Sequence, residues 1–368
     1  MPASILYLAP TFLTNRLHKQ IRGVQVFDLA FAPDLARQGL RVVVPADRSW
    51  KPRLDEHFKG APASLQVVYT PSLRKPLWNG LTLPLLIREK FDATFLGNPA
   101  RGIFPGLSLL RLRGQTGRIV LQANRPPRPE LERKLLAWNV TCTAVSEHVK
   151  AQFPASLRSR VSIYYGITGA DAFHPPLAPP TVPDQFVRFC LIGKLDNAWK
   201  GADRAIAAFA ALPADVRATA RLHLASFEKR RPATTDPCII FEPWRPADQV
   251  PAFLRSMHAM LVPSVGGEET FSQATVQAML TGLPIVTSDL PVLAEKVRGT
   301  TGDAGFICAA EADFAHAITT LTRDAALRQR MGEIARATAL ARYVWSTPDF
   351  VSRFLTPSQR EGAGGGRV

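Results

Sequence analysis

The stretch that decides the fold runs from residue 268 to residue 287 and reads EETFSQATVQAMLTGLPIVT. Thr270 is a residue type that caps helices, and apolar or small residues follow it at the spacing of one buried helix face. These residues are Phe271, Ala274, Thr275, Ala278 and Met279. Gly282 and Pro284 end the helix, and residues 283–286 have the pattern of a short buried strand. The stretch therefore predicts a helix followed by a strand, which is the repeating unit of an α/β sheet.

The start of this predicted helix has the properties of an anion site. A helix N-terminus offers free backbone N–H groups and the positive end of the helix dipole, which suits a phosphate or a diphosphate. Thr270, Phe271 and Ser272 lie at this start, and Glu269 lies beside it. We therefore expect these three residues to contact a diphosphate.

A second polar constellation occupies residues 191–201, which read LIGKLDNAWKG. Gly193 ends a predicted strand, and Lys194 and Lys200 flank a polar loop that leads into a helix. Cations on such a loop, at the carboxyl edge of a parallel sheet, can neutralise a diphosphate. Two lysines on a loop are more often solvated surface residues, and the stretch around Glu269 is what favours a binding role for them.

Strand and helix patterns alternate on both sides of residues 174–183, HPPLAPPTVP, which contain five prolines. Alternation of this kind predicts an α/β chain with two parallel, Rossmann-like sheets covered by helices. We expect a first domain at 1–175, a Pro-rich linker at 176–184, a second domain at 185–345, and a C-terminal crossover helix with a disordered tail at 346–368. The predicted strands are 5–8, 41–44, 93–96, 118–121, 140–145, 161–164, 187–192, 222–225, 239–241 and 259–262, and the predicted helices are 24–35, 202–212, 250–255 and 311–341.

Composition agrees with two domains, because 368 residues of which 46% are hydrophobic can form two cores. No signal peptide and no apolar stretch of membrane-spanning length is visible in the sequence. The four cysteines, Cys142, Cys190, Cys238 and Cys308, share no metal-ligand spacing. They are expected to be reduced and mostly buried, which predicts a cytoplasmic protein.

Positive charge is concentrated in the first half of the chain. Residues 1–175 hold 24 Lys and Arg against 11 Asp and Glu, or +13, whereas residues 176–368 hold 21 against 19, or +2. This asymmetry favours an acidic membrane surface or a phosphorylated acceptor, with a solubilising surface as the alternative. Nucleic acid is not expected, because no recognition motif accompanies the charge. Trp78 and Phe104 lie in segments that mix apolar and basic residues, so they are predicted membrane anchors or ordinary packing residues.

The stretch around Glu269 resembles the donor-site motif of retaining nucleotide-sugar glycosyltransferases of family 4. That motif has a Glu, seven further residues and a second Glu, with a Phe-Gly turn between them. Here Glu269 and Phe271 fill the first two places, Ser272 stands where the family usually has Gly, and Gln277 stands where it has the second Glu. The resemblance implies that Glu269 lies near the donor sugar as a catalytic residue and that Gln277 accepts hydrogen bonds from the ribose hydroxyls.

Other positions extend the resemblance. It implies that Lys194, in place of the usual Arg, and Lys200 clamp the donor diphosphate, with Gly193 beside the nucleoside. Gly23 occupies the place of a glycine loop that faces the donor phosphates, and Trp244 the place of a loop that borders the base. Asn124 is the best substitute for a sugar-binding His that the family often has and this chain lacks.

The resemblance implies a GT-B fold, with two Rossmann-like domains facing a central cleft, the first for the acceptor and the second for the donor. The implied reaction moves a hexosyl or related group from a UDP- or GDP-sugar, without a metal or other cofactor, and retains its configuration. The expected partner is a lipid-linked or anionic glycan acceptor in cell-envelope glycolipid or polysaccharide synthesis, on the cytoplasmic face of the membrane. The alternative is a degraded, noncatalytic relative, suggested by Ser272, Gln277 and the missing His.

Overall fold

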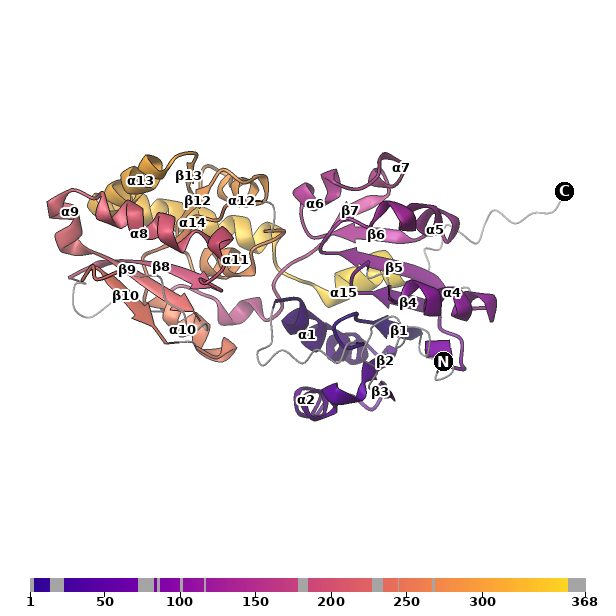
Figure 1. Cartoon of the computed structure of the whole chain (residues 1–368). Helices are drawn as coiled ribbons and strands as arrows, with labels where there is room; N and C mark the ends of the chain where they lie inside the picture. The colour runs from indigo at the N-terminus through magenta and orange to yellow at the C-terminus, as the bar shows by residue number, and fades with distance from the viewer. Residues whose placement is uncertain are drawn as a thin grey trace. The chain divides into compact units, whose positions relative to one another are not determined.

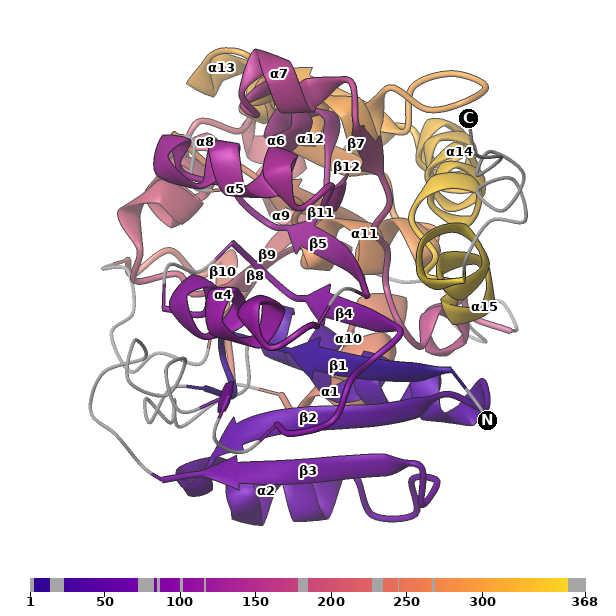
Figure 2. The ribbon, with the colours of Figure 1, turned by 90° about the vertical axis from the view of Figure 1, so that its right-hand side faces the viewer.

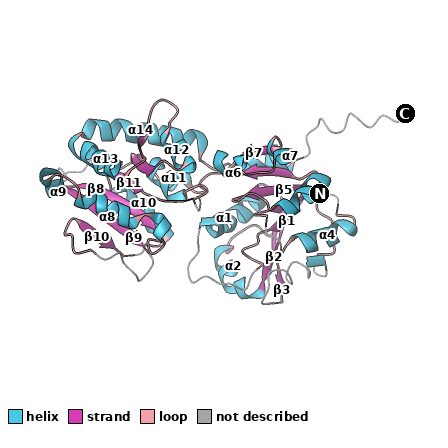
Figure 3. Ribbon diagram, turned by 45° about the horizontal axis from the view of Figure 1, so that its top comes forward, coloured by secondary structure: helices cyan, strands magenta, loops and turns pink. Residues whose placement is uncertain are grey.

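The structure is a computed structural model with two compact units. The first contains Met1–Thr168 and Ser346–Val368, and the second contains Gly169–Trp345. Both units are α/β, as the sequence predicts, with strands covered by helices (Figures 1 and 3). The residues that the structure describes are 3–13, 23–71, 83–84, 87–99, 102–115, 117–177, 185–226, 234–243, 245–266 and 269–356.

The sheet of the first unit has seven parallel strands in the order β3-β2-β1-β4-β5-β6-β7, of which Figure 2 shows β1 to β4 side by side. Its strands are β1 (Ser4–Leu8), β2 (Arg41–Asp47), β3 (Leu65–Thr70), β4 (Ala93–Leu96), β5 (Arg118–Ala123), β6 (Thr141–Ala144) and β7 (Val161–Ile163). Its helices are α1 (Gly23–Arg37), α2 (Lys51–His57), α4 (Phe104–Leu112), α5 (Glu132–Ala137), α6 (Glu147–Ala151), α7 (Ala155–Arg158) and α15 (Thr347–Phe350).

The sheet of the second unit has six parallel strands in the order β10-β9-β8-β11-β12-β13. Its strands are β8 (Val187–Gly193), β9 (Ala220–Ser226), β10 (Ile239–Glu242), β11 (Ala259–Val262), β12 (Ile285–Ser288) and β13 (Gly305–Cys308). Its helices are α8 (Ala202–Ala210), α9 (Ala214–Thr219), α10 (Val250–Arg255), α11 (Gln273–Leu280), α12 (Pro291–Val297), α13 (Glu311–Arg323) and α14 (Ala325–Arg342). The strand order reverses between β8 and β11, which is where open α/β sheets bind their ligands.

Every strand predicted from the sequence is present, but two others were missed. β3 reads LQVVYT and only its Thr70 is fully buried, so it is a half-exposed strand with a short apolar run rather than a buried core strand. The short β13, Gly-Phe-Ile-Cys, begins with a glycine, which weakens a strand pattern. The four cysteines are free and buried, as expected.

The predicted cap of α11 is wrong. The helix begins at Gln273, its N-cap is Ser272, and no side chain caps it. The physical reason is that Phe271 is buried and Ser272 has a φ of 61°, so the chain turns sharply after Thr270 before the helix can begin. The end of the helix follows the prediction, because Gly282 has a φ of 84° and the N–H of Leu283 donates to the carbonyl of Ala278 at 3.0 Å.

Residues 346–355 follow the second unit in sequence but pack on the first. The ring of Phe350 lies 5.3 Å from that of Phe31 on α1 and 5.8 Å from that of Phe95 on β4. The hydroxyl of Tyr164 donates to the carbonyl of Ser346 at 2.8 Å. This segment therefore completes the core of the first unit.

The prediction of Phe104 as a membrane anchor is wrong. Its side chain is 2% exposed and stacks on Trp138 at 6.1 Å between ring centroids, because it lies on the core face of α4. The outer face of the same helix carries Leu109 and Leu112, which are 41% and 83% exposed. Trp78 lies outside the described residues.

Asp28 is a buried carboxyl group between β1 and α1. The hydroxyl of Tyr7 donates to Asp28 Oδ1 at 2.7 Å, and that of Thr11 donates to Oδ2 at 3.1 Å. Burial raises the pKa of Asp28 to about 7, and these two hydrogen bonds oppose the shift. Asp28 therefore takes up a proton in the folded state at a pH where an unfolded chain leaves it ionised.

We expect Asp28→Asn to remove a pH dependence of stability. Because the pKa of Asp28 is raised in the folded state, its protonation stabilises the folded protein. This contribution is fully present below the unfolded pKa near 3.8 and is lost as the pH rises through about 7. Relative to the variant, the wild-type free energy of unfolding should fall across this window with a slope approaching ~1.4 kcal/mol per pH unit. Urea unfolding of both proteins across this range measures the difference, and a difference that does not change with pH contradicts the assignment.

Candidate active site

The candidate site lies at the carboxyl ends of β8 and β11, on either side of the point where the strand order reverses. Gly193 is the last residue of β8, and the loop after it leads through Lys194 and Lys200 into α8. The loop after β11 leads to Glu269 and then to α11. Parallel strands place their carboxyl ends at one edge of a sheet, so the two sequence motifs meet there.

A close backbone contact holds the two loops together. The N–H of Val265 donates to the carbonyl of Trp199 at 2.7 Å. Gly201 has a φ of 71°, and a Cβ atom there would lie 2.0 Å from the carbonyl oxygen of Pro263. Both the conformation and the space therefore require glycine at this position.

This contact brings Lys200 against Glu269. Lys200 Nζ donates to Glu269 Oε2 at 2.7 Å, and the two side chains are only 19% and 10% exposed. The same ammonium lies 4.3 Å from the ring centroid of Trp199. The lysine stem passes close to Gly193, where a Cβ atom would lie in van der Waals contact with Lys200 Cε at 3.5 Å. A pair this shielded from water interacts more strongly than an ion pair on the surface.

Lys194 lies on the same loop and has a different carboxylate neighbour. Its Nζ is 3.7 Å from Asp196 Oδ2, and its side chain is 30% exposed. The sequence predicts both lysines as one diphosphate clamp, and this role stays a prediction; the structure pairs Lys200 with Glu269 and places Lys194 near Asp196. The loop therefore presents one shielded ammonium and one more accessible ammonium.

The turn before α11 completes this edge of the second unit. Ser272 adopts the left-handed conformation, and its Oγ lies 2.6 Å from Thr275 Oγ1 in a buried hydrogen bond. Because the helix begins at Gln273, its free N–H groups lie further along the chain than predicted. Gln277 is half-buried on α11, and within the described residues its side chain has no hydrogen-bond partner.

Lys296 on α12 is a residue that the sequence did not single out. Its side chain is fully buried, and Nζ donates to the carbonyl of Val292 at 3.0 Å and to Glu295 Oε1 at 3.2 Å. The ammonium also lies 4.7 Å from the ring centroid of Phe271. Burial lowers the pKa of Lys296, while the charges of Glu295 and Glu269 oppose this shift. The only signal in the sequence is a lysine in the apolar run PVLAEKV.

Three other predicted residues lie outside the described part of the second unit. Asn124 follows β5 and Gly23 begins α1, so both lie in the first unit, and their roles toward a donor stay predictions. Trp244 lies outside the described residues. Among the described residues no three His, Cys, Asp or Glu side chains are grouped as metal ligands, and no described helix has the length and apolar character needed to cross a bilayer.

Residues 187–324 match the family model of glycosyl transferases group 1. This range contains β8, β11, α11 and every residue of the cluster described above. Over 97 residues, which are 26% of this chain, the sequence is 37% identical to a phosphatidyl-myo-inositol mannosyltransferase of Mycobacterium leprae. The match spans about a quarter (25%) of the length of that relative.

Solved structures resemble the chain over nearly its whole length. A glycosyltransferase from Rickettsia africae has a TM-score of 0.73 at 13% identity, with 97% of this chain and 100% of the other covered. The HepE protein of Anabaena in complex with UDP-glucose has a TM-score of 0.65 at 16% identity, with 96% and 98% covered. The two doubly wound parallel sheets are those of the GT-B fold, as the sequence predicts.

Proposed function

We propose that the protein is a retaining glycosyltransferase that moves a sugar from a nucleotide-diphosphate donor to an acceptor hydroxyl. The observation that carries this proposal is the Lys200–Glu269 pair at the switch point of the second sheet. It lies inside the range that matches group 1 glycosyl transferases. The shielded ammonium of Lys200 can neutralise a leaving diphosphate, and the carboxylate of Glu269 beside it can face the developing positive charge on a sugar.

Four side chains of the cluster take roles in this proposal, and Gly193 lies beside the nucleoside. Lys200 and Lys194 bind the donor diphosphate together with the free N–H groups at the start of α11, near Ser272. Glu269 lies beside the donor sugar, and Gln277 bonds the ribose hydroxyls. In a reaction that retains configuration, a donor phosphate oxygen takes the proton of the acceptor hydroxyl on the face from which the diphosphate leaves. We further propose that no metal is required, because the two lysines supply the positive charge at the phosphates.

The remaining predicted contacts complete the donor site. We propose that Asn124 touches the donor sugar, that Gly23 allows the backbone to approach the phosphates, and that Trp244 borders the base. Support for a UDP-sugar as donor is the similarity to HepE, whose structure contains UDP-glucose. A GDP-sugar is the other donor that we propose to test.

For the acceptor we propose a lipid-linked glycan or a glycolipid of the cell envelope, at an acidic membrane surface on its cytoplasmic side. Two observations support this. The relative from Mycobacterium leprae is named for a phosphatidylinositol acceptor. The first 175 residues carry 24 basic and 11 acidic side chains, or +13, and α4 exposes Leu109 and Leu112 on its outer face.

Donor turnover tests the proposed activity. With UDP- and GDP-sugars and a bacterial lipid extract as acceptor, wild-type protein should release the nucleoside diphosphate, and Glu269→Gln should lower the rate by about 100-fold or more. Glu311→Gln changes an exposed glutamate that makes only a 3.9 Å contact with Arg204, and it should retain the wild-type rate. Stabilisation by the nucleotide with no turnover of any donor would instead identify a noncatalytic relative.

The ratio of UDP affinity to uridine affinity tests the clamp. Lys200→Ala should weaken UDP binding by about tenfold or more and leave uridine binding nearly unchanged, because a charge-assisted contact contributes roughly 1.5–3 kcal/mol. Gln277→Ala should weaken both ligands by a similar factor, because both contain the ribose. Calorimetry measures both affinities, and an equal loss of the two ligands in Lys200→Ala is incompatible with a diphosphate contact.

Flotation with lipid vesicles tests membrane binding. The protein should float with vesicles that contain phosphatidylglycerol and not with neutral ones, and most of the binding should disappear at high salt, since the Debye length falls from about 10 Å at 0.1 M to about 3 Å at 1 M. The fraction that resists salt should fall in the double variant Leu109→Ser, Leu112→Ser. Leu340→Ser, which changes a leucine 50% exposed on α14, is the matched control. Equal binding to neutral vesicles would refute the electrostatic part.

A further inference from the structure

A second pocket lies at the opposite edge of the sheet in the second unit. Arg188 is the second residue of β8, His258 directly precedes β11, and Leu283 and Pro284 directly precede β12. All four residues line this pocket, which is therefore at the amino ends of the strands. Five residue intervals of β8 separate Arg188 from Gly193, or about 16 Å along an extended strand. The pocket is therefore separate from the candidate active site.

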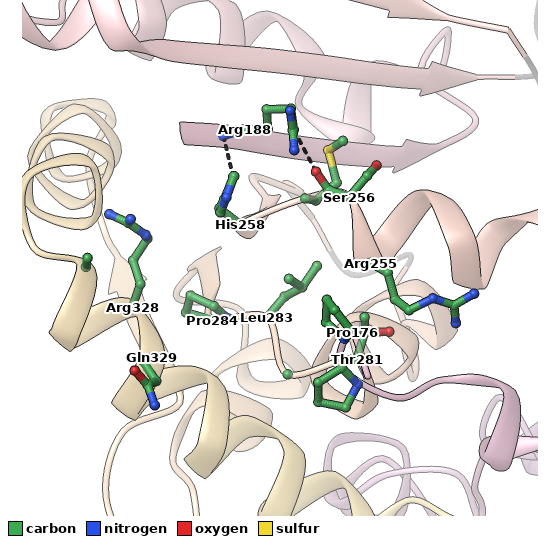
Figure 4. Close-up of a pocket in the computed structure, with 14 residues that line it drawn as sticks. Pro176, Arg188, Arg255, Ser256, His258, Thr281, Leu283, Pro284, Arg328 and Gln329 are labelled. Carbon is green, nitrogen blue, oxygen red and sulfur yellow. Dashed lines mark hydrogen bonds between the residues drawn. The ribbon is translucent and has the colours of Figure 1, made fainter. Parts of the chain in front are cut away.

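Positive charge dominates the wall of this pocket. Arg188, Arg255 and Arg328 line it together with His258, and the described residues that form its lining include no Asp or Glu. Figure 4 shows Arg188 and His258 on one side of Leu283 and Pro284, with Arg328 and Arg255 on two other sides. The three arginines come from β8, α10 and α14, so the folded sheet and two helices bring their charges together.

Backbone contacts hold these cationic side chains in place. Arg188 Nε donates to the carbonyl of Ser256 at 2.6 Å, and Arg255 donates to the carbonyl of Ala172 at 3.3 Å. Arg328 donates to the carbonyls of Leu321 and Thr322 at the end of α13. These contacts are all to carbonyl groups, and within the described residues neither Arg255 nor Arg328 forms an ion pair. Their positive charges are therefore not neutralised by a direct carboxylate contact in this part of the chain.

Two carboxylates lie near the pocket without entering its lining. Asp324 caps α14 by accepting from the N–H of Leu327 at 2.8 Å, and its charge acts on Arg328. Burial of Arg328 lowers its pKa, and Asp324 opposes that shift. Glu333 accepts from the side chain of Gln329, which lines the pocket, at 3.0 Å. The three arginines of the lining therefore outnumber these two carboxylates.

The size and the floor of the pocket fit a small organic ligand. Its volume is about 460 Å³. Met257, Leu283 and Pro284 are buried apolar residues that line it, and they are called its apolar floor. A cavity of this size with an apolar floor and a few polar groups is typical of small-molecule sites. Guanidinium groups match the geometry of phosphate oxygens, and an apolar floor suits the carbon part of an ester.

We propose that this pocket binds a phosphate ester with an apolar substituent, at a site distinct from that of the donor. Arg255 contacts the phosphate, Arg188 and Arg328 add positive charge from the other sides of the cavity, and the substituent lies against Leu283 and Pro284. The same chemistry occurs in small phosphorylated metabolites and in the headgroup of a phospholipid. The proposal does not depend on the glycosyltransferase activity, because no residue of the candidate active site takes part.

Phenyl phosphate is the probe for this site, with inorganic phosphate as the comparison that lacks an apolar part. Titration calorimetry on the full chain should show tighter binding of phenyl phosphate. Arg255→Gln should weaken that binding by about tenfold or more, since one charge-assisted contact is removed. Gln329→Glu, on the exposed surface of α14, should do the same by placing a carboxylate at the pocket. This second variant retains all three arginines, so it separates lost binding from lost folding.

Two controls locate the binding. Arg330→Gln removes an exposed arginine of α14 that does not line the pocket, and Lys200→Ala alters the candidate donor site, so both should bind phenyl phosphate as the wild type does. Soluble dihexanoyl phosphatidic acid forms a second arm in the same calorimetry. Binding that is tighter than that of phenyl phosphate and is lost in Gln329→Glu identifies a lipid as the source of the phosphate. Unchanged binding of both probes in Arg255→Gln and Gln329→Glu, or loss of phenyl phosphate binding in Lys200→Ala, overturns the proposal.

Discussion

The approach of Gly201 to the carbonyl of Pro263 is the constraint on which the candidate active site depends. Any side chain at residue 201 would place a carbon 2.0 Å from that oxygen and would separate the loops after β8 and β11. The strands beneath them are fixed by buried residues such as Phe189 and Leu261, so the loops cannot adjust by moving the sheet. Without this contact Lys200 would be a solvated surface lysine, whose ion pairs contribute little.

The sequence predicted most strands of the two sheets because each of those strands has an apolar or small run that is bounded by turns. It missed β3, whose residues are mostly half-buried, and it misplaced the start of α11 because the left-handed turn at Ser272 has no signature in a helical pattern. Lys200 and Glu269 are 69 positions apart in sequence. The sequence could place them near each other only because both follow parallel strands that end at the same edge of the sheet. It could not predict which lysine contacts Glu269, because that depends on the close approach of Gly201 to Pro263. Composition alone did not predict the burial of Phe104, because an aromatic residue among arginines can lie either at a membrane surface or in the core.

The two departures from the family 4 pattern have different structural consequences. Position 272 has a φ of 61°, a conformation that glycine adopts freely and that costs other residues roughly 1 kcal/mol. Ser272 offsets part of that cost through its buried hydrogen bond to Thr275, so the turn keeps its shape without glycine. Gln277 requires no such adjustment, because it lies half-buried on a regular helix. Neither departure therefore disrupts the backbone that supports Glu269.

The charges of the candidate site are arranged in pairs. Lys200 pairs with Glu269, Lys296 pairs with Glu295, and the charge of Glu269 also reaches Lys296 behind the ring of Phe271. In the proposed reaction an arriving diphosphate competes with Glu269 for the ammonium of Lys200. A carboxylate deprived of its partner in a shielded position is unfavourable unless another positive charge lies close by. The buried ammonium of Lys296 is such a charge, and it allows Glu269 to turn from Lys200 toward the donor sugar while the phosphates take its place.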